Sequence, residues 1–153
     1  MPPAWCVIPT CHEQAVASCH SRPALVDLLL EANADVDART HHGGWAALHT
    51  AAEYGNAHTV LQLVEQGATI DLGDHEGRTA LMWAAIRARP EALSVLLHCG
   101  ADPSLCMSGG TSVIQLAESE SSRGNRRERC LALLNGECPL FKLPAEAEAE
   151  AAA

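Results

Sequence analysis

The stretches "WAALHTAAEYGN" (residues 45–56) and "RTALMWAAIRAR" (residues 78–89) decide the fold, because they carry one pattern twice, 33 residues apart. In each, a leucine is followed three and four residues later by two alanines, a spacing that places all three side chains on one face of a helix. A weaker third copy is "GTSVIQLAESES" (residues 110–121). A buried face made of alanines is thin, so neighbouring helices can approach it closely. The pattern therefore predicts a row of narrow helices packed side by side.

A second series of segments, richer in leucine and valine, follows the same period. These segments are "LVDLLLEANAD" (residues 25–35), "TVLQLVEQGAT" (residues 59–69) and "LSVLLHCGAD" (residues 93–102). Each ends near a residue that accepts the left-handed conformation closing many helices, namely Asn33, Gly67 or Gly100. A narrow helix, a turn and a bulkier helix form one unit, and no single unit can cover its own apolar face. We therefore expect an all-α solenoid of stacked helix-turn-helix units, with Thr79 and Thr111 as N-caps or turn hydroxyls of the narrow helices.

These segments resemble the ankyrin-repeat family, whose pattern is roughly G-x-T-P-L-H-x-A-A-x-x-G-H followed by V-x-L-L-L-x-x-G-A-D. The stretches "GWAALHTAAEYGNAHTVLQLVEQGAT" and "GRTALMWAAIRARPEALSVLLHCGAD" match most of it. The resemblance implies an ankyrin-repeat domain over residues 13–136, with about four repeats of which the first and last are degenerate. Residues 1–12 would be an N-terminal extension, and residues 137–153 an acidic tail rich in alanine and glutamate.

The chain departs from the family pattern at several positions. One residue is inserted around Gly43–Gly44, and one is missing near Met107–Ser108. The family histidine, which takes part in turn hydrogen bonds, remains as His49, and we expect Met82 and Ile114 in the other two places.

Composition restricts the class of protein. The chain has 153 residues, of which 48% are apolar and 3% aromatic, which favours helices over a sheet. The formal net charge of −9 repels phosphate backbones, so nucleic acid is not an expected partner. No apolar run approaches the roughly 20 residues of a membrane span, and the N-terminus lacks a signal-peptide pattern. The seven cysteines, an odd number without a C-x-x-C pair, indicate reduced thiols in the cytoplasm or the nucleus.

No motif indicates an enzyme, a cofactor or a metal. The segment "CHEQAVASCH" (residues 11–20) pairs cysteine with histidine twice, but its spacing is unlike the short knuckles of zinc sites. The chain contains neither phosphate-binding motif, G-x-x-x-x-G-K-[ST] or G-x-G-x-x-G. We therefore expect no catalytic residue, no cofactor and no metal ligand.

The basic run "RGNRRER" (residues 123–129) allows two interpretations. It can be a solvated loop and helix start. It can also be a basic finger, made of Arg123, Arg126 and Arg127, that recognises an acidic or phosphorylated partner. Phosphorylation of Ser119, Ser121 or Ser122 would then order the loop by pairing with these arginines.

The resemblance implies that a protein partner binds at the turn tips and at the concave face of the narrow helices. At the tips, the matching residues are His41, His42, Trp45, His75, Glu76 and Arg78. On the concave face, they are Thr50, Glu53, Tyr54, Trp83, Ile86 and Arg87. We expect Trp83 at the edge of the buried stripe, in reach of the partner. The alternative is that Trp83 only covers the groove between repeats.

The sequence therefore predicts a monomeric, non-catalytic module for protein–protein interaction. A first alternative is a fragment or isoform of a larger ankyrin-repeat scaffold or adaptor. A second is a clamp on an enzyme, as in the small four-repeat inhibitors of cyclin-dependent kinases, which only the length and the repeat number suggest. The partner's identity does not follow from the fold.

Overall fold

The computed structural model describes residues 28, 35–119 and 124–136. The helices in this part of the chain are α3 (Ala47–Tyr54), α4 (Ala57–Glu65), α5 (Ala80–Ile86), α6 (Pro90–His98), α7 (Val113–Ser119) and α8 (Asn125–Leu134). No β-strand occurs within these residues, where an isolated antiparallel bridge joins Cys106 and Ser112. The predicted all-α repeat fold is confirmed.

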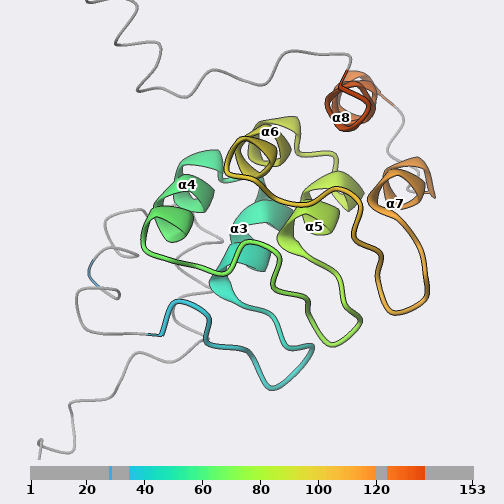
Figure 1. Cartoon of the computed structure of the whole chain (residues 1–153). Helices are drawn as coiled ribbons and strands as arrows, with labels where there is room; N and C mark the ends of the chain where they lie inside the picture. The colour runs from blue at the N-terminus through green and yellow to red at the C-terminus, as the bar shows by residue number, and fades with distance from the viewer. Residues whose placement is uncertain (1–27, 29–34, 120–123, 137–153) are drawn as a thin grey trace, which may run out of the picture.

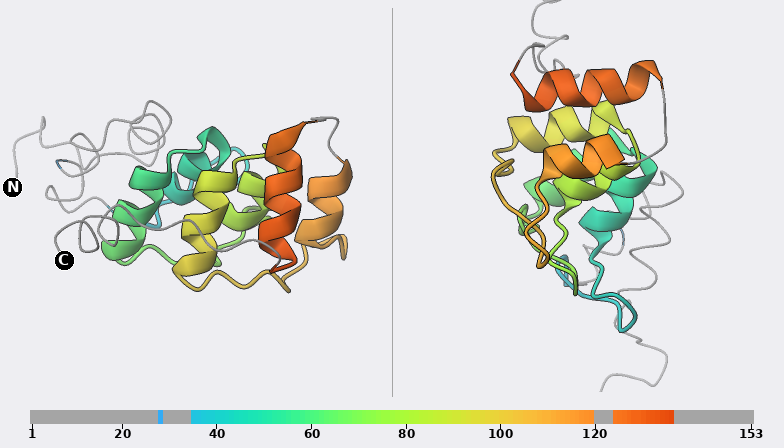
Figure 2. Two further views of the ribbon diagram at one scale, coloured as in Figure 1. Left: turned by 90° about the horizontal axis from the view of Figure 1, so that it is seen from above. Right: turned by 90° about the vertical axis from the view of Figure 1, so that its right-hand side faces the viewer.

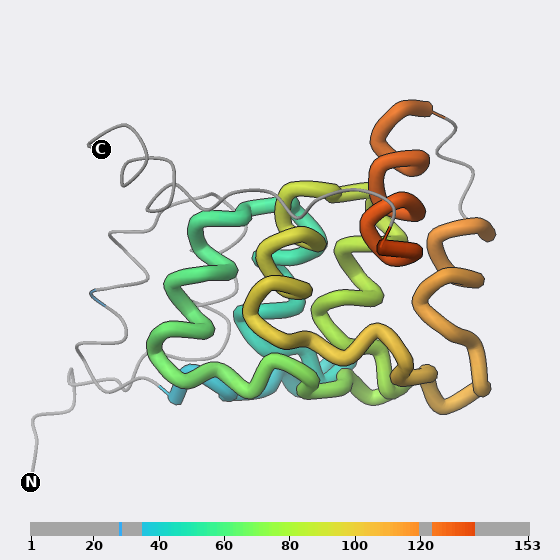
Figure 3. The backbone as a smooth tube through the Cα atoms, turned by 45° about the horizontal axis from the view of Figure 1, so that its top comes forward, coloured from blue at the N-terminus to red at the C-terminus, as the bar shows by residue number. Residues whose placement is uncertain are grey.

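The helices form two rows (Figure 1). The short helices α3, α5 and α7 pack one against the next, and the longer helices α4, α6 and α8 do the same beside them. Figure 2 and the tube in Figure 3 show the rows side by side, with consecutive helices antiparallel. The turns that precede α3, α5 and α7 project to the same side of the molecule (Figure 1). Each unit thus contacts mainly its neighbours, as a solenoid requires.

The alanine pairs are buried, as the sequence predicts. Ala51 and Ala52 of α3 have no exposed surface, and Ala84 and Ala85 of α5 are buried as well. In the second row, valine and leucine fill the core instead, including the fully buried Leu63. The narrow helices therefore approach closely while the bulkier ones supply most of the apolar volume.

The expected glycine ends of the bulkier helices are present. After α6, Gly100 has a φ of 92°, its N–H donates to Leu97 O (3.1 Å), and the N–H of Ala101 donates to Leu96 O (3.0 Å). Gly67 ends α4 in the same way. This hydrogen-bond pair is the Schellman motif, which satisfies carbonyls left free at a helix end. The third predicted end, Asn33, lies outside the described residues.

The register of the last repeat differs from the prediction. The narrow helices begin at Ala47, Ala80 and Val113, so the period is 33 residues at both steps and no residue is missing near Met107–Ser108. Ser112, not Thr111, is therefore equivalent to Thr79, which caps α5 by accepting a hydrogen bond from the N–H of Met82.

The insertion around Gly43–Gly44 is confirmed. The N–H of Thr40 donates to Trp45 O across five positions, whereas the N–H of Asp74 donates to Arg78 O across four. Gly43 and Gly44 have positive φ angles of 96° and 68°, a conformation that glycine adopts readily and that lets the longer turn close.

Candidate functional site

Three turns form the edge of the solenoid, and we call them tip 1 (residues 40–45), tip 2 (residues 74–78) and tip 3 (residues 107–111). The N–H of His75 donates to Gly43 O (3.0 Å), which joins tip 2 to tip 1. The N–H of Ser108 donates to Glu76 O (2.8 Å), which joins tip 3 to tip 2. Main-chain hydrogen bonds therefore hold the three tips in one continuous edge.

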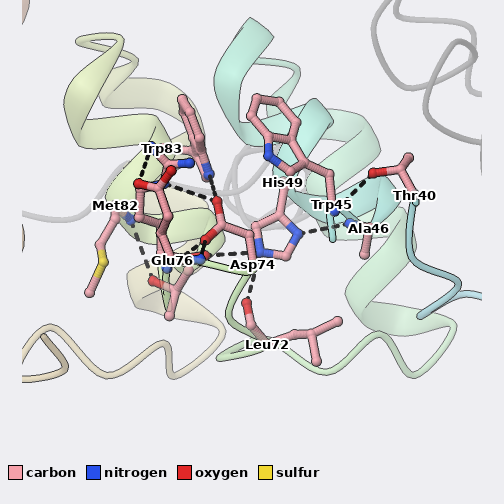
Figure 4. A network of polar contacts seen from close by, with 11 residues as sticks. Thr40, Trp45, Ala46, His49, Leu72, Asp74, Glu76, Met82 and Trp83 are labelled. Atoms are coloured by element: carbon pink, nitrogen blue, oxygen red, sulfur yellow. Dashed lines mark hydrogen bonds and ion pairs between the residues drawn. The ribbon is translucent and has the colours of Figure 1, made fainter. Parts of the chain in front are cut away.

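Asp74 organises tip 2 (Figure 4). Its Oδ1 accepts hydrogen bonds from the N–H groups of Glu76 and Arg78 (2.9 Å each). Its Oδ2 accepts from Arg78 Nε (2.9 Å) and from Trp83 Nε1 (3.2 Å). Burial alone would raise the pKa of Asp74, but the hydrogen bonds from Arg78 and Glu76 outweigh it and hold the pKa below the ordinary 3.8. The carboxylate thus stays charged and ties the turn to α5.

Trp83 is mostly buried, with 7% of its surface exposed. Its ring lies 4.3 Å from that of Trp45, measured between centroids, with the planes tilted by 53°. The guanidinium of Arg78 lies 4.4 Å from the centroid of Trp83, within the range of a cation–π contact. The sequence predicted Trp83 at the edge of the buried stripe, and the structure places most of its ring inside the core.

Two further residues of the predicted concave face are also buried, namely Thr50 and Ile86. For Ile86 the reason is that α5 has a neighbouring repeat on both sides, and all its residues from Ala80 to Ile86 are buried. Between 7% and 9% of the surface of Thr50, Trp83 and Ile86 is exposed, so a partner can touch only the outer edges of these side chains.

His49 locks tip 2 to α3 (Figure 4). Its Nδ1 accepts a hydrogen bond from the N–H of Ala46 (3.0 Å), so Nε2 carries the proton and faces Leu72 O (2.8 Å) and Arg78 O (3.2 Å). Burial lowers the pKa of His49 below its ordinary 6.5, against the opposing effect of these carbonyls. The expected turn hydrogen bonds of this histidine are therefore present.

In the last repeat, Gln115 takes the place of His49, not Ile114 as predicted. Gln115 Oε1 accepts from the N–H of Ser112 (2.9 Å), and Ser112 Oγ accepts from the N–H of Gln115 (3.3 Å). This reciprocal pair is a capping box at the start of α7.

The remaining predicted residues lie nearer to solvent. At the tips, the exposed residues are His41, His42, His75 and Glu76, while Trp45 and Arg78 are half-buried. On the helices, Tyr54 and Arg87 are exposed. Arg87 Nη2 lies 2.6 Å from Glu53 Oε1, so an ion pair joins α3 to the end of α5 beside Tyr54.

A hollow of about 260 Å³ opens between the third and fourth repeats. The residues that line it are Arg78, Trp83, Ile86, Arg87, Met107 and Leu116. Sequence reasoning missed Met107 and Leu116. With the 33-residue period kept through the last repeat, Leu116 would have aligned with Trp83, and that alignment was the available signal.

The predicted basic finger is only partly described. Arg123 lies outside the described residues, as do Ser121 and Ser122. Arg126 is exposed, and Arg127 Nη2 donates to Glu118 O (2.8 Å), which ties α8 to the end of α7. Ser119 Oγ donates to Leu116 O (3.0 Å).

Two features of the described residues bear on metal binding and on membranes. Residues 35–119 and 124–136 contain no cluster of three His, Cys, Asp or Glu side chains placed to hold a metal ion. None of the helices described has the length and apolarity that crossing a bilayer requires.

A family model of ankyrin repeats in three copies matches residues 14–105. The chain therefore belongs to the ankyrin-repeat family, whose repeats are generally protein-interaction modules. Helices α7 and α8 lie beyond the matched residues but continue both rows.

Curated relatives share the repeats over short lengths. The yeast Saccharomyces cerevisiae palmitoyltransferase AKR1 is 38% identical over 68 residues, which is 44% of this chain and 9% of that protein. The mouse nuclear factor NF-kappa-B p105 subunit is 38% identical over 85 residues, 55% of this chain and 9% of that protein. The Arabidopsis thaliana ADP-ribosylation factor GTPase-activating protein AGD4 is 30% identical over 126 residues, 82% of this chain and 15% of that protein. The similarity thus concerns a small part of each relative.

Proposed function

We propose that this chain is a non-catalytic binding module that presents its tips and the adjoining helix ends to a protein partner. We call this region the front surface; its solvent-facing residues are His41, His42, Trp45, Glu53, Tyr54, His75, Glu76, Arg78 and Arg87. The observation that carries the proposal is the main-chain linkage of the three tips, reinforced by the buried Asp74. A surface fixed before binding loses little conformational entropy when a partner docks.

Two of the three thiols in the described residues, Cys99 and Cys130, favour a binding role over a catalytic one. Burial raises the pKa of the Cys130 thiol to about 11, so it stays protonated near neutral pH and is a poor nucleophile. Burial likewise raises the pKa of Cys99. We place the protein in the cytoplasm or the nucleus, acting as a monomer without a cofactor. The same surface serves a free-standing module or the binding segment of an adaptor or scaffold.

Site-specific photocrosslinking tests the proposal. The photoreactive amino acid p-benzoylphenylalanine is placed at Tyr54 on the front surface, or at the exposed Glu65 at the end of α4 in the other row. We expect specific protein adducts from position 54 in cells that express the chain and none from position 65. Adducts that form equally at both positions, or at position 65 alone, would contradict a front-surface interaction.

A further inference from the structure

The hollow between the third and fourth repeats has walls of two kinds. Its apolar part comes from Trp83 and Ile86 of α5, Met107 of tip 3 and Leu116 of α7. Its volume of about 260 Å³ lies below the range of roughly 300–1,000 Å³ that is usual for small-molecule and cofactor pockets. The size suits a side chain that a partner inserts.

The ionisable groups in the wall are both cationic, Arg78 and Arg87. The carboxylates that hold them do not line the hollow: Asp74 and Glu53 have side chains only 0% and 15% exposed, and the exposed Glu76 lies on the tip. Each guanidinium is already paired with a carboxylate outside the wall, so what the wall offers a ligand is guanidinium N–H donors and no acidic side chain.

Arg87 has donors left for a ligand. Its Nε and Nη2 both donate to the same oxygen, Glu53 Oε1 (3.0 and 2.6 Å), and its side chain is 51% exposed. A guanidinium carries five N–H donors, so a second carboxylate can bind without displacing Glu53.

The floor of the hollow is held in place before any ligand arrives. Trp83 is fixed through its Nε1 by Asp74 and stacks under Arg78, and tip 3 is held by the bond from Ser108 N–H to Glu76 O. A fixed apolar floor below two arginines favours a partner that inserts one apolar side chain and carries a negative charge beside it.

We propose that the hollow receives a large apolar side chain from a linear acidic segment of the partner, and that Arg87 binds a carboxylate next to that anchor in sequence. The inference rests on the proposed function, because it specifies which partner chemistry the front surface takes. It differs from the basic-finger hypothesis, which concerns α8 and the loop before it.

Selection from a random peptide library displayed on phage tests this inference with the whole chain as bait. We expect enriched peptides to carry Leu, Ile, Met or Phe next to Asp or Glu. The enriched peptides are then synthesised, and their affinities are measured for the native chain and for Arg87→Ala. We expect Arg87→Ala to weaken binding about tenfold or more, the typical effect of losing a charged hydrogen bond worth ~1.4 kcal/mol.

Arg129→Ala is the matched control. Arg129 lies on α8, is 49% exposed and pairs with one carboxylate, Glu91, at 3.2 Å, so it resembles Arg87 in exposure and in having a single carboxylate partner. We expect it to leave peptide affinity unchanged. As an independent readout, the indole N–H resonance of Trp83 should shift on addition of the peptide, and replacing the anchor residue with glycine should abolish the shift.

Three results would overturn the inference: enrichment of basic or uncharged peptides, equal effects of the two arginine variants, or no enrichment at all. None of these touches the crosslinks at position 54, which test the front surface separately. If those crosslinks persist while the peptide results fail, the front surface remains the proposed binding surface, and the proposed apolar anchor with its neighbouring carboxylate is wrong.

Discussion

Asp74 shows how one buried carboxylate determines the shape of an exposed turn. It receives two main-chain N–H groups of tip 2 on one oxygen and two side chains on the other. A charge that is removed from water in this way is stabilised only by its full set of partners. The turn and the indole of Trp83 therefore depend on the same residue.

We expect Asp74→Ala to lower the free energy of unfolding by about 3 kcal/mol, because it leaves Trp83 Nε1 and the tip N–H groups without their acceptor. Urea denaturation followed by circular dichroism measures the change. Glu76→Ala is the control: its exposed side chain pairs with Arg78 at the surface, and we expect a loss within about 0.5 kcal/mol. Similar losses in the two variants would refute the central role of Asp74.

His49 gives the fold a dependence on pH. Because its pKa is lowered in the folded state, the unfolded chain binds more protons between that folded value and 6.5, so stability rises with pH through this window. Protonation of Nδ1 would also destroy the acceptor that Ala46 N–H needs.

We expect the free energy of unfolding to fall as the pH is lowered from about 7 to about 5, and His49→Gln to reduce this fall. Glutamine is chosen because Gln115 already accepts the equivalent main-chain N–H in the last repeat. Urea titrations at several pH values measure the slope, with the exposed His58→Gln as the control for loss of a histidine. An unchanged slope in His49→Gln would show that the pH dependence arises elsewhere.

The sequence predicted Trp45, Glu76 and Arg78 at the tips and Trp83 on the concave face, but not the contacts among them. In the structure, Trp83 contacts both Trp45 and Arg78. Trp83 is buried by the repeats on both sides of α5, and its indole N–H is held by Asp74, which the sequence alone shows only as an aspartate in a turn. For the same reason Trp83→Ala is a poor test of binding: it removes a buried ring and its hydrogen bond, so loss of a partner would not be separable from loss of the fold.

Among the elements, α7 shows how a capping residue sets the register of a repeat. The sequence offers two adjacent hydroxyl residues before this helix, Thr111 and Ser112, and both are acceptable N-caps. The capping box with Gln115 selects Ser112. The sequence alone could predict the helix, but only the hydrogen bonds between Ser112 and Gln115 show which of the two residues is its N-cap.

We expect Ser112→Ala to destabilise the chain by about 1 kcal/mol, the usual cost of losing an N-cap side chain. Thr111→Ala should cost less than about 0.5 kcal/mol, since the residue lies outside the capping box. Chemical denaturation of both variants compares them directly. A larger loss for Thr111→Ala than for Ser112→Ala would instead support Thr111 as the N-cap and the shorter spacing between the second and third narrow helices that the sequence predicted.

At the scale of the whole molecule, α7 packs against α5 and α8, and no further repeat covers its other side among the described residues. Ile114 and Glu118 of α7 are exposed, although the equivalent Leu81 and Ala85 of α5 are buried under the next repeat. The uncovered face of α7 thus combines the charged Glu118 with the apolar Ile114, which is 37% exposed. The two-row architecture itself could be predicted from the repeated leucine and alanine spacing. Each narrow helix has an apolar face that only the equivalent helix of a neighbouring repeat can cover.

We expect the same truncation to have different effects at these equivalent positions. Leu81→Ala should cost about 2–5 kcal/mol, because the side chain is fully enclosed. Ile114→Ala should cost less than about 1 kcal/mol, because the side chain is partly in water and leaves no closed cavity. Thermal unfolding of the two variants provides the comparison, and equal losses would mean that α7 is covered in solution.

The constant 33-residue spacing of the narrow helices has a consequence for how such a protein can change. The contacts of α5 and α6 with the preceding repeat are equivalent to their contacts with the following one. A tandem duplication of one 33-residue period would therefore insert a complete extra layer without a new type of contact. The lengthened protein would carry another tip and another side-chain recess, so the reach of its recognition surface could grow in discrete steps through gene duplication.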